Sequence, residues 1–599
     1  MEAQVVKMSS GSHSGSSVKR RIGVSFIIEL IVFIALVLLL ARVVRLHATV
    51  TPAADETMES PPVTAPLPVE TQSTVVVTPT PEPTPEPTPE PTPEPEFNPV
   101  HTENTDPVKF IKNTAVQVNG TTLSGDEGYS AAEPIYFGYG EDYTDVDGII
   151  TFRGNNFRDG GSYGYANMTE FALSGEWKVP TGTLVHDGAV WTGSGWVGQP
   201  LIVRWPAETK THMNMYDWAK QDDGLVEVIY ATMDGNVYFL DLYTGRNTRD
   251  TLKLGYTFKG SGALDPRGYP ILYLGAGYDS DRGVSRVFIV NLLDCSVMYE
   301  FGNLDSFSLR GALSYFDSSA LVDAETDQLI YPGENGILYI MKLNTEYDEE
   351  KGTLSISPDP VVKWHYYGVR TSLGSYWVGM ESSAVIWRGH IIMSDNGGNL
   401  MCLNLNTLEL DWVQDTLDDT NSSPVLSIED GHPYIYISTS FHLGWRSWTT
   451  ADVPILKVDA ENGEVVWRTD YTCHSESGVS GGVQSTIALG KNDLEGYIYV
   501  TVARTPSASA GVLACIDRDT GEVVWEHKTT MYTWSSPVLV YNEDGSGYVA
   551  YCTYGSYLYL LDGKSGEVLD SFNLLGGVEA SPAVYKDMLV IGTRQCLIW

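Results

Sequence analysis

Residues 516–525 read Ile-Asp-Arg-Asp-Thr-Gly-Glu-Val-Val-Trp, and residues 458–467 repeat this pattern as Val-Asp-Ala-Glu-Asn-Gly-Glu-Val-Val-Trp. Weaker copies occupy residues 561–569, 240–245 and 403–412. The tryptophans that end three of these copies, at positions 412, 467 and 525, are 55 and 58 residues apart. A nearly fixed period of this length indicates a repeat protein.

Each repeat also contains an apolar strand that opens with small polar residues, followed by a hairpin around a glycine-containing turn. Units of four strands around an axis form a β-propeller. We count eight openings, which predicts an all-β, eight-bladed propeller over residues 171–599, with seven blades as the alternative because the second opening is irregular. Residues 171–177 resemble an outer strand and would complete the last blade by pairing with the C-terminal strands. The openings are Gln199-Pro200, a stretch within 260–270, Ser318-Ser319, Ser382-Ser383, Ser422-Ser423, Ser485-Thr486, Ser535-Ser536 and Ala580-Ser581.

The first hundred residues have a different character. Residues 22–41 form an apolar run that is long enough to cross a bilayer as a helix. More basic residues precede this run than follow it, which predicts a cytoplasmic tail at residues 1–21 and an extracytoplasmic remainder. Residues 47–100 are rich in Pro, Thr and Glu and predict a stiff, extended linker. Residues 101–170 are expected to form an extension that packs on the propeller. Hydrogen bonds from Arg153, Asn155, Asn156 and Arg158 are expected to hold it there, and the alternatives for these residues are that they cap the channel mouth or bind an anion.

Composition narrows the class of function. The 599 residues carry a net charge of −39, so there is no basic surface for nucleic acid. The six cysteines include no adjacent pair and no Cys-x-x-Cys, and a domain of this size needs no disulfide framework. Most of them lie in apolar, strand-like runs, which favours buried thiols.

The Asp-x-x-Thr-Gly-Glu-Val-Val-Trp turn at 517–525 and its copies resemble the PQQ-binding-like β-propeller family, which includes quinoprotein alcohol dehydrogenases and the outer-membrane assembly lipoprotein B. The resemblance implies that the repeat tryptophans dock between neighbouring blades. The dehydrogenases of this family stack the cofactor on adjacent cysteines and also hold Ca²⁺, and this chain lacks such a pair. The resemblance therefore leaves PQQ unlikely as a cofactor. The matching tryptophans here are Trp177, Trp364, Trp412, Trp467 and Trp525.

The residue before each opening is expected to face the central channel. These residues form a ring in sequence register that offers carboxylates, amides and one indole. Such a ring suits a hard cation such as Ca²⁺ or a sugar that stacks on Trp534, but a water-filled polar channel explains it equally well. The members are Asp317, Glu381, Asn421, Gln484, Trp534 and Glu579, with Val197 at the first blade.

These observations favour a membrane-tethered, extracytoplasmic propeller that binds or scaffolds an envelope protein or a wall polysaccharide without catalysis. No catalytic residue and no required cofactor are predicted. The alternatives are a PQQ- and Ca²⁺-dependent oxidoreductase and a carbohydrate-active propeller enzyme, because this fold occurs in both enzymes and scaffolds.

Overall fold

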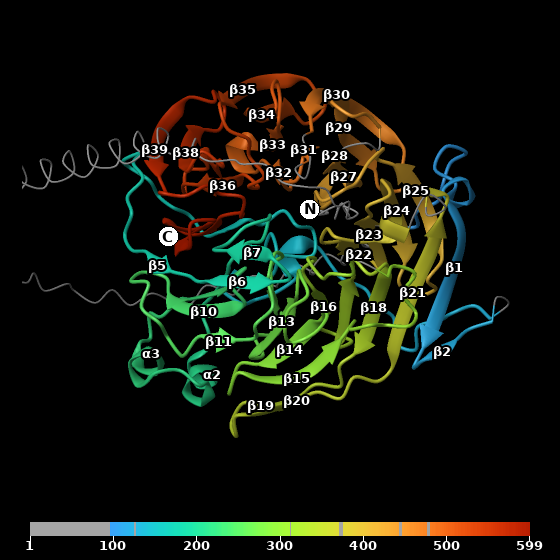
Figure 1. Cartoon of the computed structure of the whole chain (residues 1–599), viewed down its shortest axis with the longest axis horizontal. Helices are drawn as coiled ribbons and strands as arrows, with labels where there is room; N and C mark the ends of the chain where they lie inside the picture. Colours follow the sequence, from blue (N-terminus) through green and yellow to red (C-terminus); the bar gives the residue numbers. More distant parts are fainter. Residues whose placement is uncertain (1–95, 125–126, 312, 371–374, 443–445, 476–479) are drawn as a thin grey trace, which may run out of the picture. The chain divides into compact units, whose positions relative to one another are not determined.

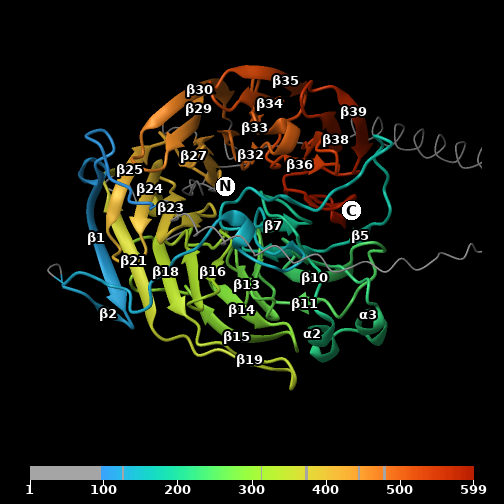
Figure 2. The same ribbon diagram turned by 180° about the vertical axis from the view of Figure 1, so that it is seen from behind.

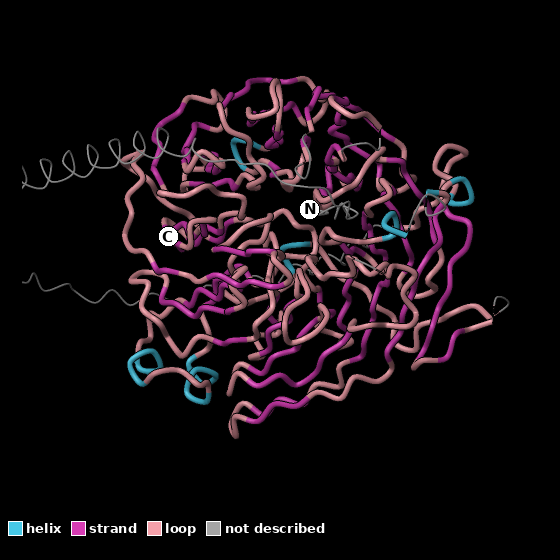
Figure 3. Tube along the Cα trace, in the orientation of Figure 1, coloured by secondary structure: helices cyan, strands magenta, loops and turns pink. Residues whose placement is uncertain are grey.

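The computed structural model describes residues 96–599 except 125–126, 312, 371–374, 443–445 and 476–479. In this part of the chain, antiparallel sheets follow one another in chain order around a common centre (Figure 1 and Figure 2). Strands dominate throughout (Figure 3). The α-helices of the described residues are short, α2 (Ala207–His212) and α3 (Asp217–Gln221). The predicted all-β class is confirmed.

Three sheets form the first half of the array, and two of them take up strands from the N-terminal extension. In hydrogen-bonded order their strands are β3 (Gly148–Ile149), β8 (Leu201–Val203), β9 (Glu227–Ala231), β10 (Asn236–Asp241) and β11 (Leu252–Lys253); β12 (Ala263–Leu264), β13 (Ile271–Gly275), β14 (Val287–Asn291) and β15 (Ser296–Phe301); and β16 (Leu321–Asp323), β17 (Gln328–Pro332), β18 (Ile337–Lys342), β21 (Val361–Gly368), β1 (Ile111–Val118) and β2 (Thr121–Thr122).

Four further sheets repeat the same antiparallel pattern. They consist of β22 (Val385–Trp387), β23 (His390–Ser394), β24 (Asn399–Asn404) and β25 (Leu410–Asp415); β26 (Val425–Glu429), β27 (His432–Ser438), β29 (Thr450–Asp459) and β30 (Val465–His474); β32 (Ala488–Leu489), β33 (Tyr497–Ala503), β34 (Gly511–Asp517) and β35 (Val523–Thr529), with β28 (Ser440–Phe441) and β31 (Gly481–Gly482) beside β33; and β36 (Val538–Tyr541), β37 (Gly547–Cys552), β38 (Tyr557–Asp562) and β39 (Val568–Asn573).

The C-terminal strands join segments from the start of the described chain. β4 (Ser162–Tyr163) pairs with β40 (Ala583–Tyr585), which also pairs with β41 (Met588–Val590). β42 (Gly592–Thr593) pairs with β43 (Leu597–Ile598), and β43 pairs with β5 (Val179–Pro180). The two N-terminal strands that meet the last strands, β4 and β5, therefore lie on either side of the predicted 171–177. Two separate hairpins remain, β6 (Thr183–His186) with β7 (Ala189–Thr192) and β19 (Glu346–Asp348) with β20 (Thr353–Ser355).

Local hydrogen bonds and backbone geometry determine the conformation of the repeat turn. The side chain of Asp517 accepts hydrogen bonds from the backbone and the hydroxyl of Thr520, at 2.9 and 2.8 Å. Gly521 has φ of 74°, which only glycine adopts without strain. A Cβ at Gly521 would also lie 2.7 Å from the indole of Trp467, in the preceding sheet. Glycine at this position therefore permits both the turn and the close contact between the two sheets.

Four of the five repeat tryptophans donate from indole Nε1 to a backbone carbonyl of the next sheet. Trp364 differs, because its Nε1 has no hydrogen-bond partner among the described residues. It lies on β21, whose outer edge is covered by β1, and Val116 of β1 is its direct neighbour in register. The other four contacts are Trp177 to Leu242 at 2.8 Å, Trp412 to Ala460 at 2.8 Å, Trp467 to Arg518 at 3.0 Å and Trp525 to Gly563 at 3.2 Å.

Hydrogen bonds join most openings of the innermost strands to the next opening. In most links a backbone N–H of one opening donates to a serine hydroxyl of the next, as Ser319 does to Ser383 at 2.9 Å. The last opening returns to the first, because the N–H of Ser581 donates to the carbonyl of Gly198 at 2.9 Å. The small polar residues at these positions thus tie the sheets together near the centre. The other links are Gln199 to Ser261, Ser319 Oγ to Gly262, Ser383 to Ser423, Thr486 to Ser536 and Ser536 to Ser581.

Residues 148–166, which we call the hub segment, contact the first strand region of each of the seven sheets described above and also pair with β40. Arg158 is fully buried and donates to the carbonyls of Ala384 and Ser319, at 2.8 and 2.9 Å. Arg153 donates to the carbonyl of Pro537 at 2.7 Å, and Asn156 donates to Ile386 at 2.8 Å. These three side chains thus form hydrogen bonds from the hub segment to residues at the start of innermost strands. Asn155 instead bonds within the segment, to Asp159. Further links join Ile150 to Leu264, Phe157 to Leu426 and Asp159 to Lys491.

The predicted tail (1–21), membrane helix (22–41) and nearly all of the linker (47–100) lie outside the described residues. Within the described residues, no helix combines the length and the apolar character that a membrane crossing requires. All six cysteines are free thiols. Cys402, Cys473, Cys515 and Cys552 are buried, whereas Cys295 and Cys596 are half-buried.

Candidate functional site: a lysine among buried carboxyl groups

A small pit lies at the centre of the array, at the end where the innermost strands begin. Its volume is about 20 Å³, which is room for about one water molecule or one monatomic ion. Phe152 of the hub segment is part of its lining, so this segment borders the pit. The remaining lining comes from the loops that lead into five successive openings, and it includes Trp196, Val197, Lys259, Asp317, Glu381 and Asn421.

Lys259 is the cation of the pit. Its Nζ lies 2.6 Å from Oδ2 of Asp317, and both side chains are 5% exposed. The same Nζ lies 4.7 Å from the ring centre of Trp196 and 5.0 Å from that of Tyr315. Burial alone would lower the pKa of Lys259, but the charges of Asp317, Glu334 and Glu381 outweigh it and raise the pKa to about 12. Lys259 is therefore a fixed positive charge at physiological pH.

Three carboxyl groups surround this charge. One oxygen from each of Asp317, Glu334 and Glu381 lies within 4.8 Å of the other two. Burial raises the pKa of Glu334 well above its usual value, against the nearby Arg310, whose guanidinium lies 2.8 Å from it. Burial, together with the charges of Asp419 and Asp317, raises the pKa of Glu381 to about 7. The cluster therefore holds protons that ordinary carboxylates would have released at neutral pH.

The predicted channel ring divides into two groups. Asp317, Glu381 and Asn421 come together with Val197 in the pit, and Asn421 donates to Glu381 at 2.7 Å. Trp534 and Glu579 lie on the other side of Trp196. The ring centres of Trp534 and Trp196 are 5.9 Å apart, and Glu579 lies 3.5 Å from Arg594. Gln484 is buried but does not line the pit.

Sequence reasoning missed Lys259, Glu334 and Arg310. Lys259 directly precedes the stretch 260–270, where the opening is irregular, so its register was not recognised. Glu334 lies in the hairpin turn between β17 and β18, and Arg310 lies in the loop between β15 and β16. In a four-stranded antiparallel unit, the second hairpin turn returns to the end where the first strand begins. Charged residues in these turns were the available signal.

A row of aromatic side chains crosses the same end of the array and includes Trp196 of the pit. Neighbouring ring centres along this row are 4.8–6.1 Å apart, within the range of favourable aromatic pairs. Most of the members are half-buried, so they offer both packing area and a polar edge. In order they are Tyr315, Tyr278, Trp191, Trp196, Trp534, Tyr532 and Tyr554.

Replacing Glu381 by Gln should weaken the pH dependence of stability. The raised pKa means that the folded protein binds this proton more tightly than the unfolded chain does. The stabilisation is complete below the unfolded pKa and is lost as the pH rises through about 7. We expect about 1–2 kcal/mol from this group, since its side chain is partly exposed. The free energy of unfolding should fall less between pH 5 and pH 8 for Glu381→Gln than for the unchanged protein. An equal fall in both proteins would contradict the raised pKa of Glu381.

Comparison with known proteins agrees with the repeat. Residues 509–596 match the family model PQQ_2, described as Outer membrane protein assembly factor BamB. A curated protein of that name from Legionella pneumophila (strain Paris) is 26% identical over 221 residues, which are 36% of this chain and half the length of that protein. The match thus spans about half of the curated relative.

Among solved structures, the chain is similar to BamB from Moraxella catarrhalis, with a TM-score of 0.40 and 14% identity over 62% of this chain and 90% of that one. It is also similar to quinohemoprotein alcohol dehydrogenase from Comamonas testosteroni, with a TM-score of 0.47 and 12% identity over 74% of this chain and 76% of that one. The sequence matches confirm the predicted resemblance, and the chain carries PQQ-like β-propeller repeats.

Proposed function

We propose that this protein is an eight-bladed propeller, tethered outside the cytoplasmic membrane, that binds a protein of the cell envelope without catalysing a reaction. The blade count is supported by the hydrogen bonds between openings, which run from Gln199 to Ser423 and from Thr486 to Ser581 and return from Ser581 to Gly198. The pairing of β43 with β5 supports a ring that the two ends of the array complete together. The tether rests on the apolar run at residues 22–41.

The binding role rests on three exposed leucines in an unusual backbone conformation. Leu304, Leu313 and Leu575 are 82%, 42% and 59% exposed, and their φ angles are 47°, 55° and 58°. A bulky residue at positive φ is strained, at a cost of about 1–3 kcal/mol. These leucines lie on connections that lead into an innermost strand, at the end of the array that holds the pit. A strained backbone that holds apolar side chains in solvent indicates a surface that a partner covers.

Other exposed apolar side chains lie on loops and on the β6–β7 hairpin at the same end, and we call the whole set the loop face. Because the aromatic row crosses this end, the loop face combines rigid aromatic groups with exposed aliphatic ones, which is typical of protein interfaces. The net charge of −39 favours a partner with a basic rim. The members of the loop face are Val185, Val190, Leu304, Leu309, Leu313, Val369, Trp448 and Leu575.

The pit fits neither PQQ nor a calcium ion well. About 20 Å³ is far below the ~300 Å³ or more of an organic ligand site, and none of the six cysteines is adjacent to another in the sequence. A calcium ion needs six to eight oxygen ligands, whereas Lys259 and Arg310 already supply positive charge to these carboxyl groups. For these reasons we favour a structural role for the cluster over the oxidoreductase alternative.

Photo-crosslinking in the producing cells tests this function. A photoreactive phenylalanine analogue at Leu304 or Leu575 of the full chain should capture one discrete partner band. The same analogue at Val108 or Val524, which are also exposed but lie on other surfaces, should not. Crosslinks at all four positions, or at none, would contradict the proposal. PQQ-dependent dye reduction by the purified protein would instead favour the oxidoreductase.

A further inference from the structure

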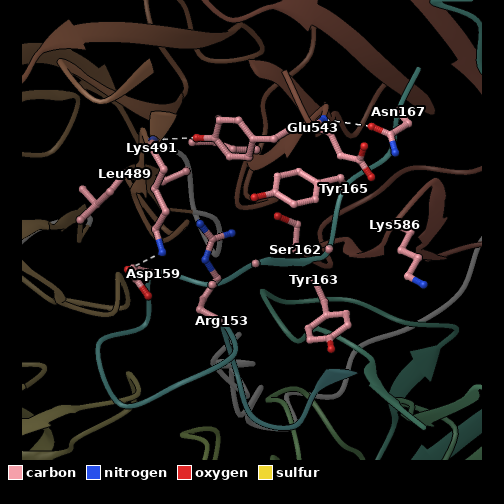
Figure 4. A pocket seen from close by; sticks show the side chains of 16 residues that line it. Arg153, Asp159, Ser162, Tyr163, Tyr165, Asn167, Leu489, Lys491, Glu543 and Lys586 are labelled. Carbon is pink, nitrogen blue, oxygen red and sulfur yellow. Dashed lines mark hydrogen bonds and ion pairs between the residues drawn. The ribbon is translucent and has the colours of Figure 1, made fainter. Parts of the chain in front are cut away.

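A second, larger cavity lies at the opposite end of the array, where the innermost strands finish. Its volume is about 620 Å³, within the usual range of small-molecule sites. One side is formed by residues 159–167, mostly from the hub segment, and the other by the ends of β32 and β36 and the turn after β40 (Figure 4). None of the predicted ring residues lines it. We call it the hub cavity.

Two cations face this cavity without a carboxylate partner. Arg153 is 2% exposed, and Figure 4 shows its guanidinium directed into the cavity. Its Nη1 donates to Pro537, whereas its Nε has no hydrogen-bond partner among the described residues. Lys586 lies across the cavity and makes no ion pair within the described part of the chain. A buried guanidinium with an unpaired N–H group is unusual in a folded protein, and a bound anionic group accounts for it.

The local architecture holds Arg153 in this position. A Cβ at Gly161 would lie 2.7 Å from Nη1 of Arg153, so the glycine leaves room for the guanidinium. The neighbouring ion pair is already complete, because Lys491 lies 2.8 Å from Asp159. That pair leaves Arg153 and Lys586 available to a ligand. The cavity therefore has a net positive lining in a chain whose overall charge is −39.

The remaining lining suits a sugar. Tyr165 is 50% exposed and presents an aromatic ring for stacking. Ser162, Asn167 and Glu543 provide a hydroxyl, an amide and a carboxylate, which are the groups that exchange hydrogen bonds with sugar hydroxyls. Leu489 and Leu539 form an apolar part of the wall. An aromatic ring, polar groups and two unpaired cations against the single unpaired carboxylate of Glu543 fit a sugar that carries a carboxylate.

We propose that the hub cavity binds an acidic glycan, with a carboxylate at the guanidinium of Arg153, one sugar ring on Tyr165 and the positive charge of Lys586 at the opposite wall. This site is separate from the loop face, and it does not depend on the proposed protein partner. It would give the protein a second attachment, to a polysaccharide, at the end opposite its protein-binding surface.

Calorimetry with the full-length protein in detergent tests the proposal. The probes are tetragalacturonate and a hyaluronan tetrasaccharide, with maltotetraose as the neutral control. We expect at least one acidic probe to bind with a dissociation constant below about 1 mM and the neutral sugar to bind at least tenfold more weakly. Higher ionic strength should weaken the binding, because a charge pair contributes to it.

Matched variants locate the site. Tyr165→Ala and Lys586→Ala should each weaken binding at least fivefold, while Tyr243→Ala and Lys564→Ala, which remove exposed residues outside the lining, should leave it unchanged. An unchanged melting temperature would show that each variant is folded. Absence of binding by both acidic probes, equal binding of the neutral sugar, or equal loss in the control variants would overturn the proposal. Full competition by inorganic phosphate, with no loss in Tyr165→Ala, would show an anion site only and would also overturn it.

Discussion

Replacing Arg158 by Met should lower the free energy of unfolding by at least about 4 kcal/mol. Arg158 is fully buried and donates to three carbonyl groups and to the hydroxyl of Thr151, at 2.8–2.9 Å. Its removal leaves these acceptors unpaired inside the protein, and each unpaired buried group costs about 1–3 kcal/mol. Two of the carbonyls belong to different sheets, so the loss is not confined to the hub segment. Denaturant unfolding of the purified protein measures the effect.

Two further variants make this result interpretable. Burial lowers the pKa of Arg158 to about 10, so the side chain remains charged at pH 7 and Arg158→Lys keeps the charge while losing the fork of donors. We expect Arg158→Lys to recover only part of the stability. Arg282→Met, which removes an exposed arginine, should change the stability by about 0.5 kcal/mol or less. A loss below about 1 kcal/mol for Arg158→Met would show that the hub segment does not hold the sheets together.

Replacing Trp412 by Ala should cost about 3–5 kcal/mol, the usual range for a fully buried tryptophan. The side chain is completely buried and donates to the carbonyl of Ala460 at 2.8 Å. It also fills the space beside Gly463, where a Cβ would lie 2.7 Å from the indole. The substitution therefore opens a cavity between two sheets and leaves a carbonyl without its donor. The melting temperature and denaturant unfolding both report the loss.

The matched control is Trp448→Ala, since Trp448 is 76% exposed on the loop face. This substitution should leave the stability almost unchanged and should weaken capture of the partner instead. If Trp412→Ala and Trp448→Ala were equally stable, docking of tryptophans between sheets would not contribute to the fold. If Trp448→Ala unfolded the protein, the loop face would be part of the core.

Local sequence chemistry predicts the repeating part of the fold well. The Asp517 side chain, the left-handed conformation of Gly521 and the tryptophan four residues later are all encoded within ten residues, so the turn and the outer strand follow from the pattern alone. The serine openings were found because each begins a buried strand. Both signals depend on short-range structure, in which a few neighbouring residues decide the outcome.

Short-range sequence patterns could not predict the contacts between sheets. Trp364 occupies a repeat position, yet β1 covers its strand, and no local pattern relates residues 111–118 to residues 361–368. Lys259 and Glu334 reach the same pit from an irregular opening and a hairpin turn that are 75 residues apart in the sequence. Register predicted Asp317 and Glu381 as neighbours, but it could not supply the cation between them. The division of the predicted ring by Trp196 likewise depends on the loop after β7.

The hub segment also sets the order in which the molecule can assemble. Its residues precede the innermost strand of every sheet that they contact, and Ser162 pairs with Val584, close to the far end of the chain. Closing such a long loop carries a large entropic cost and slows folding. During synthesis each new sheet can add to a segment that is already present, while the last contacts wait for the final strands. A chain shortened to residues 171–599 would retain the repeats but would leave the inner carbonyls of Ser319, Ala384 and Pro537 without their donors, which favours aggregation over folding.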